Sequence, residues 1–334
     1  MLGHFQSEIF RFPAPYHMFG GKPNGLMTRE DAAKLSPLTP PEEVDAIRLD
    51  AFGFRNDHDV TAPKEPGEVR VFVVGGSTTF MGSSNSNTIP GQLERLFQAH
   101  DHFNVTCYNF GIISQCSTQQ LVLTCTKLLD FQPDIIVTYD GINELIGHYG
   151  FDPRVGNPYN FFFMESVLNA VRIKDQGGQS VLEFGQMNWR LPELREQVKY
   201  LSPEWRMAIV RNYINNIRKM KQITASFDIG YVSFIQPMIY HKSPLVGKEI
   251  AFAEERSYYS THGEYYANVI EHAKSIDGAS EDQKYIFDVT RVFRDFPHEV
   301  YWDFAHTSDR GNQEIAKAIY PHVQRKLQIM GKLH

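Results

Sequence analysis

Ser77, Asp303 and His306 are the residues of this sequence that could together perform nucleophilic chemistry. A serine hydroxyl is a weak nucleophile until a base takes its proton, and a histidine base needs a carboxylate that fixes its tautomer and stabilises the imidazolium. Asp303 and His306 lie three positions apart, so one turn of chain could supply both partners. The three residues predict attack of Ser77 on an acyl carbon, with His306 as the base.

Donors for the negative charge that develops on the attacked oxygen are predicted at Ser77, Gly111 and Asn143. The backbone N–H groups of Ser77 and Gly111 and the side-chain amide of Asn143 would provide three, and the loss of one such donor typically costs roughly 3–4 kcal/mol of transition-state stabilisation. Taken singly, Ser77 and Asn143 could instead cap helices, and Gly111 could be a turn glycine. Their order along the chain, together with Asp303 and His306, favours the catalytic interpretation.

Each of these residues, except the Asp303 and His306 pair, follows a segment with the pattern of a buried strand. Apolar β-branched runs alternate with helical patterns, which predicts a parallel sheet of about five strands flanked by helices in a three-layer α/β/α sandwich. Ligands of such a sheet bind beyond the carboxyl ends of its strands. The expected strands are 69–74, 104–109, 134–139, 229–236 and 285–289, and the expected helices are 89–100, 118–129, 203–227, 248–276 and 312–330.

The chain of 334 residues divides into an N-terminal extension, residues 1–66, and a main domain, residues 67–334. The extension is rich in proline, glycine and charged residues, ends in a run of helix breakers and is expected to pack on the main domain, with one helix near residues 41–51. Because Ser77 and His306 lie far apart in the sequence, one catalytic domain spans most of the chain.

Two insertions are expected in the main domain, at about 148–201 and 241–284. The first contains an aromatic run at Tyr159 and residues 161–163, interpreted as packing for an extra helix rather than as the wall of a binding site. Aromatic residues make up 13% of the chain, an excess that would suit an apolar or sugar-stacking cleft.

The composition limits the partners and the compartment. The net charge is −6 and no long apolar run occurs, so neither a nucleic-acid groove as the main surface nor a membrane span is expected. The three cysteines are odd in number, and the sequence as given begins without the pattern of a signal peptide, which favours a cytoplasmic protein. The histidines show no metal-ligand spacing, so no metal and no cofactor are expected.

The residues singled out above resemble the four blocks of the SGNH (GDSL-like) hydrolase family. Ser77 in a glycine turn, Gly111 after the second strand, Asn143 in a Gly-x-Asn after the third and Asp303-x-x-His306 near the end follow those blocks in order and spacing. The resemblance implies a flavodoxin-like α/β/α fold and an enzyme that cleaves esters or thioesters, often acetyl groups on carbohydrates, without a metal. It implies Ser77 as nucleophile, His306 as base, Asp303 as its orienter, and Ser77, Gly111 and Asn143 as the oxyanion hole.

Two positions depart from the family pattern. Gly76 stands where Gly-Asp-Ser has its aspartate, as in the GGSTT-type subgroup, and Glu144 stands where an aspartate commonly follows the asparagine. Candidate substrate contacts are Thr78, Glu144 and Gln236, of which Gln236 could also simply end its strand. Arg55 could pair with a substrate carboxylate but is expected to be a solvated surface residue.

The expected function is that of a serine esterase which forms an acyl-enzyme on Ser77 and hydrolyses it, with a small or carbohydrate O-acyl ester, above all an O-acetyl ester, as substrate. An acyltransferase or a thioesterase would use the same site. A non-catalytic carbohydrate-binding or assembly protein would be expected to have lost part of Ser77, Asp303 and His306, all of which are present. The oligomeric state is left open, a homo-oligomer included.

Overall fold

The structure of the chain is a computed structural model, and it describes residues 9–14, 16–158, 190–254, 259–277 and 280–333. The aromatic run that begins at Tyr159 lies outside these residues, so the prediction made for it stays a prediction. None of the described helices is both long and apolar enough to cross a membrane.

Five parallel strands form the central sheet in the order β6-β5-β7-β8-β9. The first of them in the chain lies between the second and the third, so the chain reverses its direction of winding between β5 and β7, which is the flavodoxin-like arrangement. Ligands of such sheets bind beyond the carboxyl ends of the strands at this reversal. The strands are β5 (Val69–Gly75), β6 (Val105–Gly111), β7 (Ile135–Asp140), β8 (Gly230–Ile235) and β9 (Ile286–Asp288).

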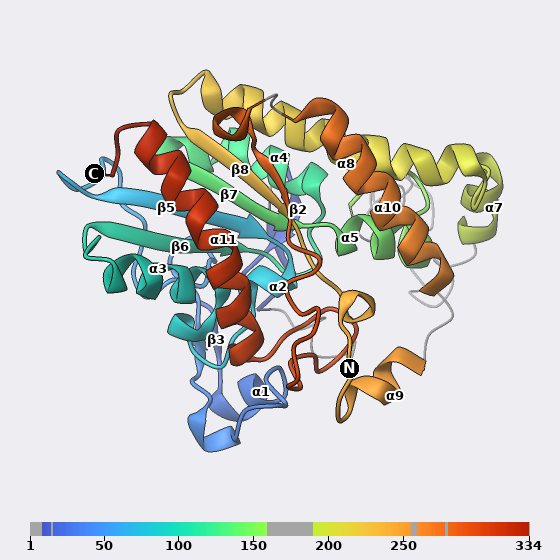
Figure 1. Cartoon of the computed structure of the whole chain (residues 1–334), viewed down its shortest axis with the longest axis horizontal. Helices are drawn as coiled ribbons and strands as arrows, with labels where there is room; N and C mark the ends of the chain where they lie inside the picture. Colours follow the sequence, from blue (N-terminus) through green and yellow to red (C-terminus); the bar gives the residue numbers. More distant parts are fainter. Residues whose placement is uncertain (1–8, 15, 159–189, 255–258, 278–279, 334) are drawn as a thin grey trace, which may run out of the picture.

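Helices cover both faces of the sheet, which confirms the predicted three-layer sandwich (Figure 1). Side chains alternate between the two faces of a strand, and in β5 Val71 and Val73 pack on one side while Phe72 and Val74 pack on the other. The first face is covered by α3 (Ile89–Ala99) and α11 (Asp309–Ile329), and the second by α4 (Ser117–Thr126), α8 (Pro203–Ala225) and α10 (Tyr259–Ile276).

The N-terminal residues form two small antiparallel pairs that pack on the main sheet's carboxyl edge. Met27 and Ile47 of the second pair share a core cluster with residues that follow β5 and β6, namely Phe80, Met81 and Ile113. The pairs are β1 (Phe12–Ala14) with β2 (Met18–Gly20) and β3 (Leu26–Met27) with β4 (Ile47–Arg48), and a short helix, α1 (Arg29–Ala33), follows β3.

The helix predicted over residues 41–51 does not form. The structure has a single 3-10 turn, η2 (Pro41–Glu43), followed by the strand β4. Ile47 and Arg48 pair with β3 instead, and Asp45 donates its N–H to the carbonyl of Ser83. Pairing with distant chain thus outweighs the local helical preference.

The remaining elements are short and lie mostly beyond the carboxyl ends of the strands. The helix expected over 248–276 is found as two helices, α9 and α10. The helices not yet given are α2 (Ser77–Phe80), α5 (Ile142–Ile146), α7 (Arg190–Gln197) and α9 (Glu249–Glu254), and the short 3-10 or π turns are η3 (Asn85–Asn87), η4 (Leu128–Phe131), η5 (Gly147–Phe151), η7 (Ile239–His241) and η8 (Glu281–Gln283).

Candidate active site

Ser77 is the first residue of α2 and is separated from β5 by Gly76 alone, so that the strand's last residue, Gly75, and Gly76 form the turn. Both glycines have close neighbours. A Cβ on Gly75 would lie 2.7 Å from the carbonyl oxygen of Tyr139, and a Cβ on Gly76 would meet Nδ2 of Asn143. The turn therefore brings Ser77 to the carboxyl edge of the sheet with the amide of Asn143 close to Gly76.

His306 joins Ser77 to Asp303 in one hydrogen-bonded chain. The hydroxyl of Ser77 donates to Nε2 of His306, with 2.7 Å between Oγ and Nε2. On the other side of the ring, Nδ1 donates to Oδ2 of Asp303 at 2.7 Å. All three side chains are buried, with exposed fractions of 9% for Ser77, 7% for His306 and 6% for Asp303. This is the geometry in which a histidine can deprotonate a serine while a carboxylate holds its tautomer.

The loop that carries Asp303 and His306 is closed by its own backbone. The N–H of Trp302 donates to the carbonyl of His306, and the N–H of Ser308 donates to the carbonyl of Val300 at 2.7 Å. The Trp302 ring also stacks on the imidazole, with ring centroids 4.8 Å apart and planes 17° from parallel. These contacts fix the orientation of the imidazole before any substrate binds.

Asp303 is held as a carboxylate. Its Oδ1 accepts the backbone N–H groups of Ala305 and His306 at 2.8 and 2.7 Å. Burial alone would raise the pKa of Asp303, but attraction to His306 and these hydrogen bonds outweigh it and keep the pKa below its usual range. An ionised Asp303 can stabilise the imidazolium that would form when His306 takes a proton.

A buried ion pair anchors the same loop from the second predicted insertion. Glu249 Oε1 accepts the N–H groups of Val300 and Tyr301 at 2.9 and 3.0 Å. Its Oε2 accepts from Nζ of Lys242 at 2.6 Å, and neither side chain is exposed. The pair therefore fixes the backbone just ahead of Asp303. No sequence pattern indicated this anchor, because Glu249 and the loop that it holds lie 51 positions apart.

Asn143 lies in the first turn of α5, after β7. Its Nδ2 donates one proton to the carbonyl of Gln115 at 2.8 Å, which leaves the second amide proton for another acceptor. The turn before it depends on Gly141, whose φ of +141° is rarely adopted by other residues. The hydroxyl of Tyr265 donates to the carbonyl of Gly141 at 3.0 Å, so α10 holds this turn in place.

Gly111 does not offer the predicted backbone donor in this structure. Its N–H already donates to Oδ1 of Asn109 at 2.9 Å. A Cβ at position 111 would lie 2.7 Å from the backbone nitrogen of Phe80 and 3.0 Å from Cβ of Thr79. The glycine is needed because α2 packs directly against the end of β6, which is a packing role rather than a role as donor.

Ser114, in the turn just after Gly111, is a residue that the sequence interpretation missed. It has a φ of +63°, and within the described ranges its N–H has no acceptor. The next carbonyl, that of Gln115, is the one that accepts from Asn143, so this turn lies at the site. A positive φ is usually found at glycine, so a serine at position 114 did not indicate this backbone conformation in the sequence.

The predicted substrate contacts are enclosed by protein. Thr78 is 5% exposed and Gln236 is 2% exposed, whereas no part of Glu144 is exposed. Oε1 of Glu144 accepts the N–H of Ser117, so this side chain supports the backbone behind Asn143 instead of facing a ligand. Gln236 follows β8 at the same edge of the sheet, and its Nε2 has no acceptor among the described residues.

Arg55 is not the solvated surface residue that the sequence interpretation favoured. Its side chain is 1% exposed. The guanidinium donates to the backbone carbonyls of Phe80 and Gly82. These donors of Arg55 are therefore used within the protein, and the guanidinium does not face a substrate carboxylate.

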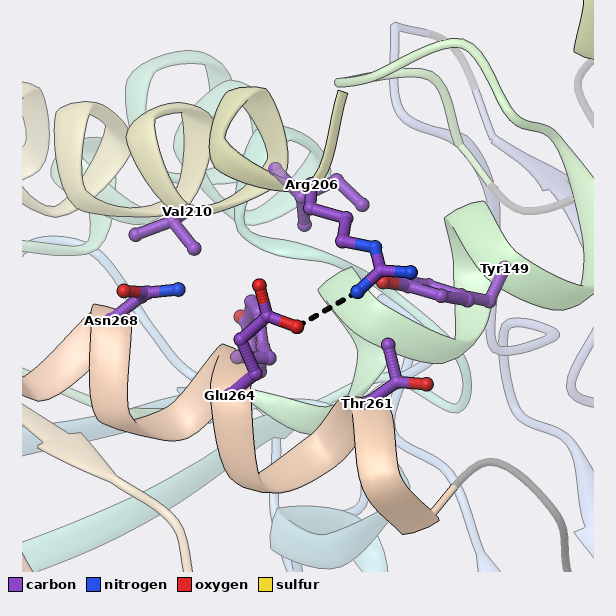
Figure 2. A pocket seen from close by; sticks show the side chains of 8 residues that line it. Tyr149, Arg206, Val210, Thr261, Glu264 and Asn268 are labelled. Carbon is purple, nitrogen blue, oxygen red and sulfur yellow. Dashed lines mark hydrogen bonds and ion pairs between the residues drawn. The ribbon is translucent and has the colours of Figure 1, made fainter. Parts of the chain in front are cut away.

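A small pocket lies between α8 and α10 (Figure 2). Arg206 and Glu264 form an ion pair across it with 2.8 Å between Nη1 and Oε2. Neither Ser77 nor His306 lines this pocket, which is formed by Tyr149, Arg206, Ile209, Val210, Thr261, Glu264, Tyr265 and Asn268.

Two further histidines, the buried His148 and the partly buried His241, contact backbone. His148 Nδ1 lies 3.0 Å from the carbonyl of Asp152. His241 Nδ1 accepts the N–H of Met238 at 3.1 Å, and burial lowers the pKa of His241 to about 4, which keeps the ring neutral and able to accept. In the part of the chain that the structure describes, no group of three or more His, Cys, Asp or Glu side chains is placed to hold a metal ion.

Comparisons with known proteins give matches in structure but not in sequence. No family model matches the chain, and no curated protein matches it. Among solved structures, the chain is similar to LAE5, an alpha/beta hydrolase from the metagenome of Lake Arreo in Spain, with 14% identity, a TM-score of 0.45 and coverage of 80% of this chain and 96% of that one. The acetylxylan esterase Axe2 from Geobacillus stearothermophilus gives the same four values. The acetyl xylan esterase AlAXEase is 12% identical with a TM-score of 0.45, over 76% of this chain and 100% of that one.

Proposed function

We propose that the chain is a serine esterase of the SGNH (GDSL-like) type, GGSTT subgroup, with Ser77 as nucleophile, His306 as general base and Asp303 as the residue that orients His306. The observation that carries the proposal is the hydrogen-bonded chain from Ser77 through His306 to Asp303, with 2.7 Å at each of its two steps. Ser77 comes from the end of β5, whereas Asp303 and His306 come from the loop before α11, so the three side chains meet only because the fold brings these distant segments together.

In the acylation step, Oγ of Ser77 attacks the carbonyl carbon of the ester while Nε2 of His306 takes the hydroxyl proton. The tetrahedral intermediate then collapses, the carbon–oxygen bond to the alcohol breaks, and His306 returns the proton to the leaving oxygen. Water attacks the resulting acyl-enzyme in the same way, with His306 again as base. Asp303 stays ionised throughout and stabilises the imidazolium.

The oxyanion of both intermediates needs donors on the side of the carbonyl away from His306. The N–H of Ser77 and the second amide proton of Asn143 are two of them. For the third we propose the N–H of Ser114 in place of that of Gly111, because the Gly111 N–H is already bonded to Asn109. Such donors act from fixed positions, which is why each contributes several kcal/mol to the barrier reduction.

The substrate class that fits is a small or carbohydrate ester with a short acyl group, such as acetyl. The small exposed fractions of Ser77 and His306 support a short acyl group, because a long chain would need more open space beside Oγ. The unpartnered Nε2 of Gln236 supports one polar contact to the substrate from the end of β8.

The assignment is tested by labelling and by substitution. A fluorophosphonate probe should form one adduct, at Ser77, and Ser77→Ala should lower kcat on p-nitrophenyl acetate by about 10³-fold or more. Ser226→Ala, at the exposed end of α8, is the matched control and should react like the unaltered protein. Labelling at another residue, or activity that survives Ser77→Ala, would overturn the assignment.

Acyl transfer to an acceptor other than water starts from the same acyl-enzyme as hydrolysis. The two reactions are therefore distinguished by their products. With p-nitrophenyl acetate alone we expect acetate to form as fast as nitrophenol. If nitrophenol release is fast only when an alcohol, a sugar or an amine is added, and the acetylated acceptor appears, the enzyme is an acyltransferase. A faster reaction with an acetyl thioester than with the matching oxygen ester would indicate a thioesterase.

A further inference from the structure

Arg55 is a fully buried cation whose donors are bonded to one short loop. Its side chain is 1% exposed. Nη1 donates to the carbonyl of Phe80 at 3.0 Å, Nη2 to the carbonyl of Gly82 at 2.9 Å and Nε to Oδ1 of Asn85 at 2.9 Å. Burial lowers the pKa of Arg55 to about 10, so the guanidinium is still charged at neutral pH.

The loop that Arg55 holds is the continuation of the helix that starts at Ser77. Phe80 is the last residue of α2, and the N–H of Met81 donates to the carbonyl of Ser77 at 2.9 Å. A helix of a single turn has little stability of its own, because the cost of nucleation is not recovered over so few residues. The orientation of α2, and with it that of Ser77, must therefore come from its surroundings, which include the packing against β6 and the contacts at its own end.

The same loop, residues 81–87, is bonded on its other side to α11, the helix that follows His306. Nδ2 of Asn312 donates to two carbonyls of the loop at 2.9 Å each. Oδ1 of Asp309 accepts the N–H of Ser83 at 2.9 Å. The loop thus lies between Arg55, from the N-terminal residues, on one side and the helix that follows His306 on the other.

We propose that Arg55 is a positioning residue for the reaction at Ser77, which holds the end of α2 so that Oγ of Ser77 stays within hydrogen-bond distance of Nε2 of His306. The inference rests on the proposed function. Under this proposal the N-terminal residues contribute to catalysis, because Arg55 belongs to the part of the chain before β5. A displacement of the nucleophile by about 1 Å can lower the rate by about 10²-fold, so a small shift of α2 is enough to be measured.

Arg70 provides a matched control within the chain. It is also 1% exposed, and its Nη1 donates to the carbonyls of Thr61 and Phe131 at 2.6 and 2.7 Å. Arg70 is near the start of β5, however, whereas Ser77 follows the end of that strand. Loss of its guanidinium should disturb the fold to a similar degree without moving α2.

The experiment compares Arg55→Lys and Arg55→Met with Arg70→Lys and Arg70→Met. For each protein, Tm, kcat, KM on p-nitrophenyl acetate and the rate of fluorophosphonate labelling are measured. We expect the Arg55 variants to lower kcat and the labelling rate by about 10²-fold, with KM within about threefold. The Arg70 variants should lower Tm by a similar amount but leave kcat and the labelling rate within about twofold. Arg55→Gly with added guanidinium ion at low millimolar concentration should regain part of the lost kcat.

Two results would overturn the inference. One is an Arg55→Lys protein that is folded at the assay temperature and has unchanged kcat and labelling rate. The other is an equal loss of kcat in the Arg55 and Arg70 variants, which would show that only stability was affected. If Arg55→Met does not fold, the kcat of Arg55→Lys and the rescue of Arg55→Gly by guanidinium still test the role of Arg55. Failure of the proposed function is recognised separately, by activity that survives Ser77→Ala.

Discussion

Nε2 of His306 lies 2.7 Å from Oγ of Ser77, although the two residues are 229 positions apart in the chain. Ser77 follows β5, a strand with a neighbour on each side in the sheet, and His306 lies in the loop before α11. No local preference connects them. The contact exists because the sheet fixes one segment and α11, packed on the sheet through its apolar side chains, fixes the other.

Asp303→Asn should lower kcat by about 10⁴-fold, the size of loss seen when such a carboxylate is replaced in a serine hydrolase triad. An asparagine amide at this position can donate to Nδ1 and so favours the tautomer in which Nε2 carries a proton and cannot act as base. The measurement is kcat on p-nitrophenyl acetate. Asp282→Asn, which removes an exposed charge, is the control, and comparable activity in the two variants would contradict the role of Asp303.

Gly76→Ala should displace the amide of Asn143 while leaving the fold intact. The backbone at Gly76 has a φ of −88°, which alanine can adopt, and the new Cβ would meet Nδ2 of Asn143, the end of a side chain that can rotate away. Loss of this oxyanion donor should lower kcat by about 10²-fold or more.

Gly263→Ala is the control for this substitution, because a Cβ there meets nothing within 4 Å. The two variants are compared by kcat and by calorimetric Tm. A Gly76→Ala protein with unchanged Tm and unchanged kcat would mean that Asn143 has no part in stabilising the oxyanion.

Much of the fold was predictable because a parallel sheet leaves a strong local pattern. All five strands and the helices α3, α4, α8 and α11 lie within a few residues of their predicted bounds, since each strand is a short apolar run and each helix has one apolar face. The placement of Ser77 and Asn143 at one edge of the sheet follows from the same pattern, because both come directly after strands.

What the sequence did not reveal depends on contacts between distant segments. In the sequence, Arg55 cannot be distinguished from a surface arginine. Its burial follows from contacts with Phe80, Gly82 and Asn85, which lie at least 25 positions away. Gly111 is needed for packing against α2, and its N–H is bonded to Asn109, which no spacing indicates. The prediction of a helix over residues 41–51 was wrong because β4, which lies in this segment, pairs with β3.

Glu144 is a buried carboxyl group beside another one, Asp140, and this makes its pH dependence testable. Burial raises the pKa of Glu144, and burial together with the charge of Glu144 raises the pKa of Asp140 well above its usual range. A carboxyl group whose folded pKa is raised stabilises the fold below its unfolded pKa, about 4, and this contribution is lost as the pH rises through the folded pKa. Asp303, with its lowered pKa, contributes in the opposite sense, because its stabilisation is lost as the pH falls.

Glu144→Gln should therefore gain stability relative to the unaltered protein as the pH is raised. Glutamine loses no proton, and its Oε1 can still accept the N–H of Ser117, as Oε1 of Glu144 does. In urea unfolding at pH 4 and pH 8, the difference in free energy of unfolding between Glu144→Gln and the unaltered protein should shift in favour of the variant at pH 8, by on the order of 1 kcal/mol. The exposed Glu196→Gln is the control and should show no such shift. A difference that is the same at both pH values would mean that Glu144 is ionised in the folded protein as readily as in the unfolded chain.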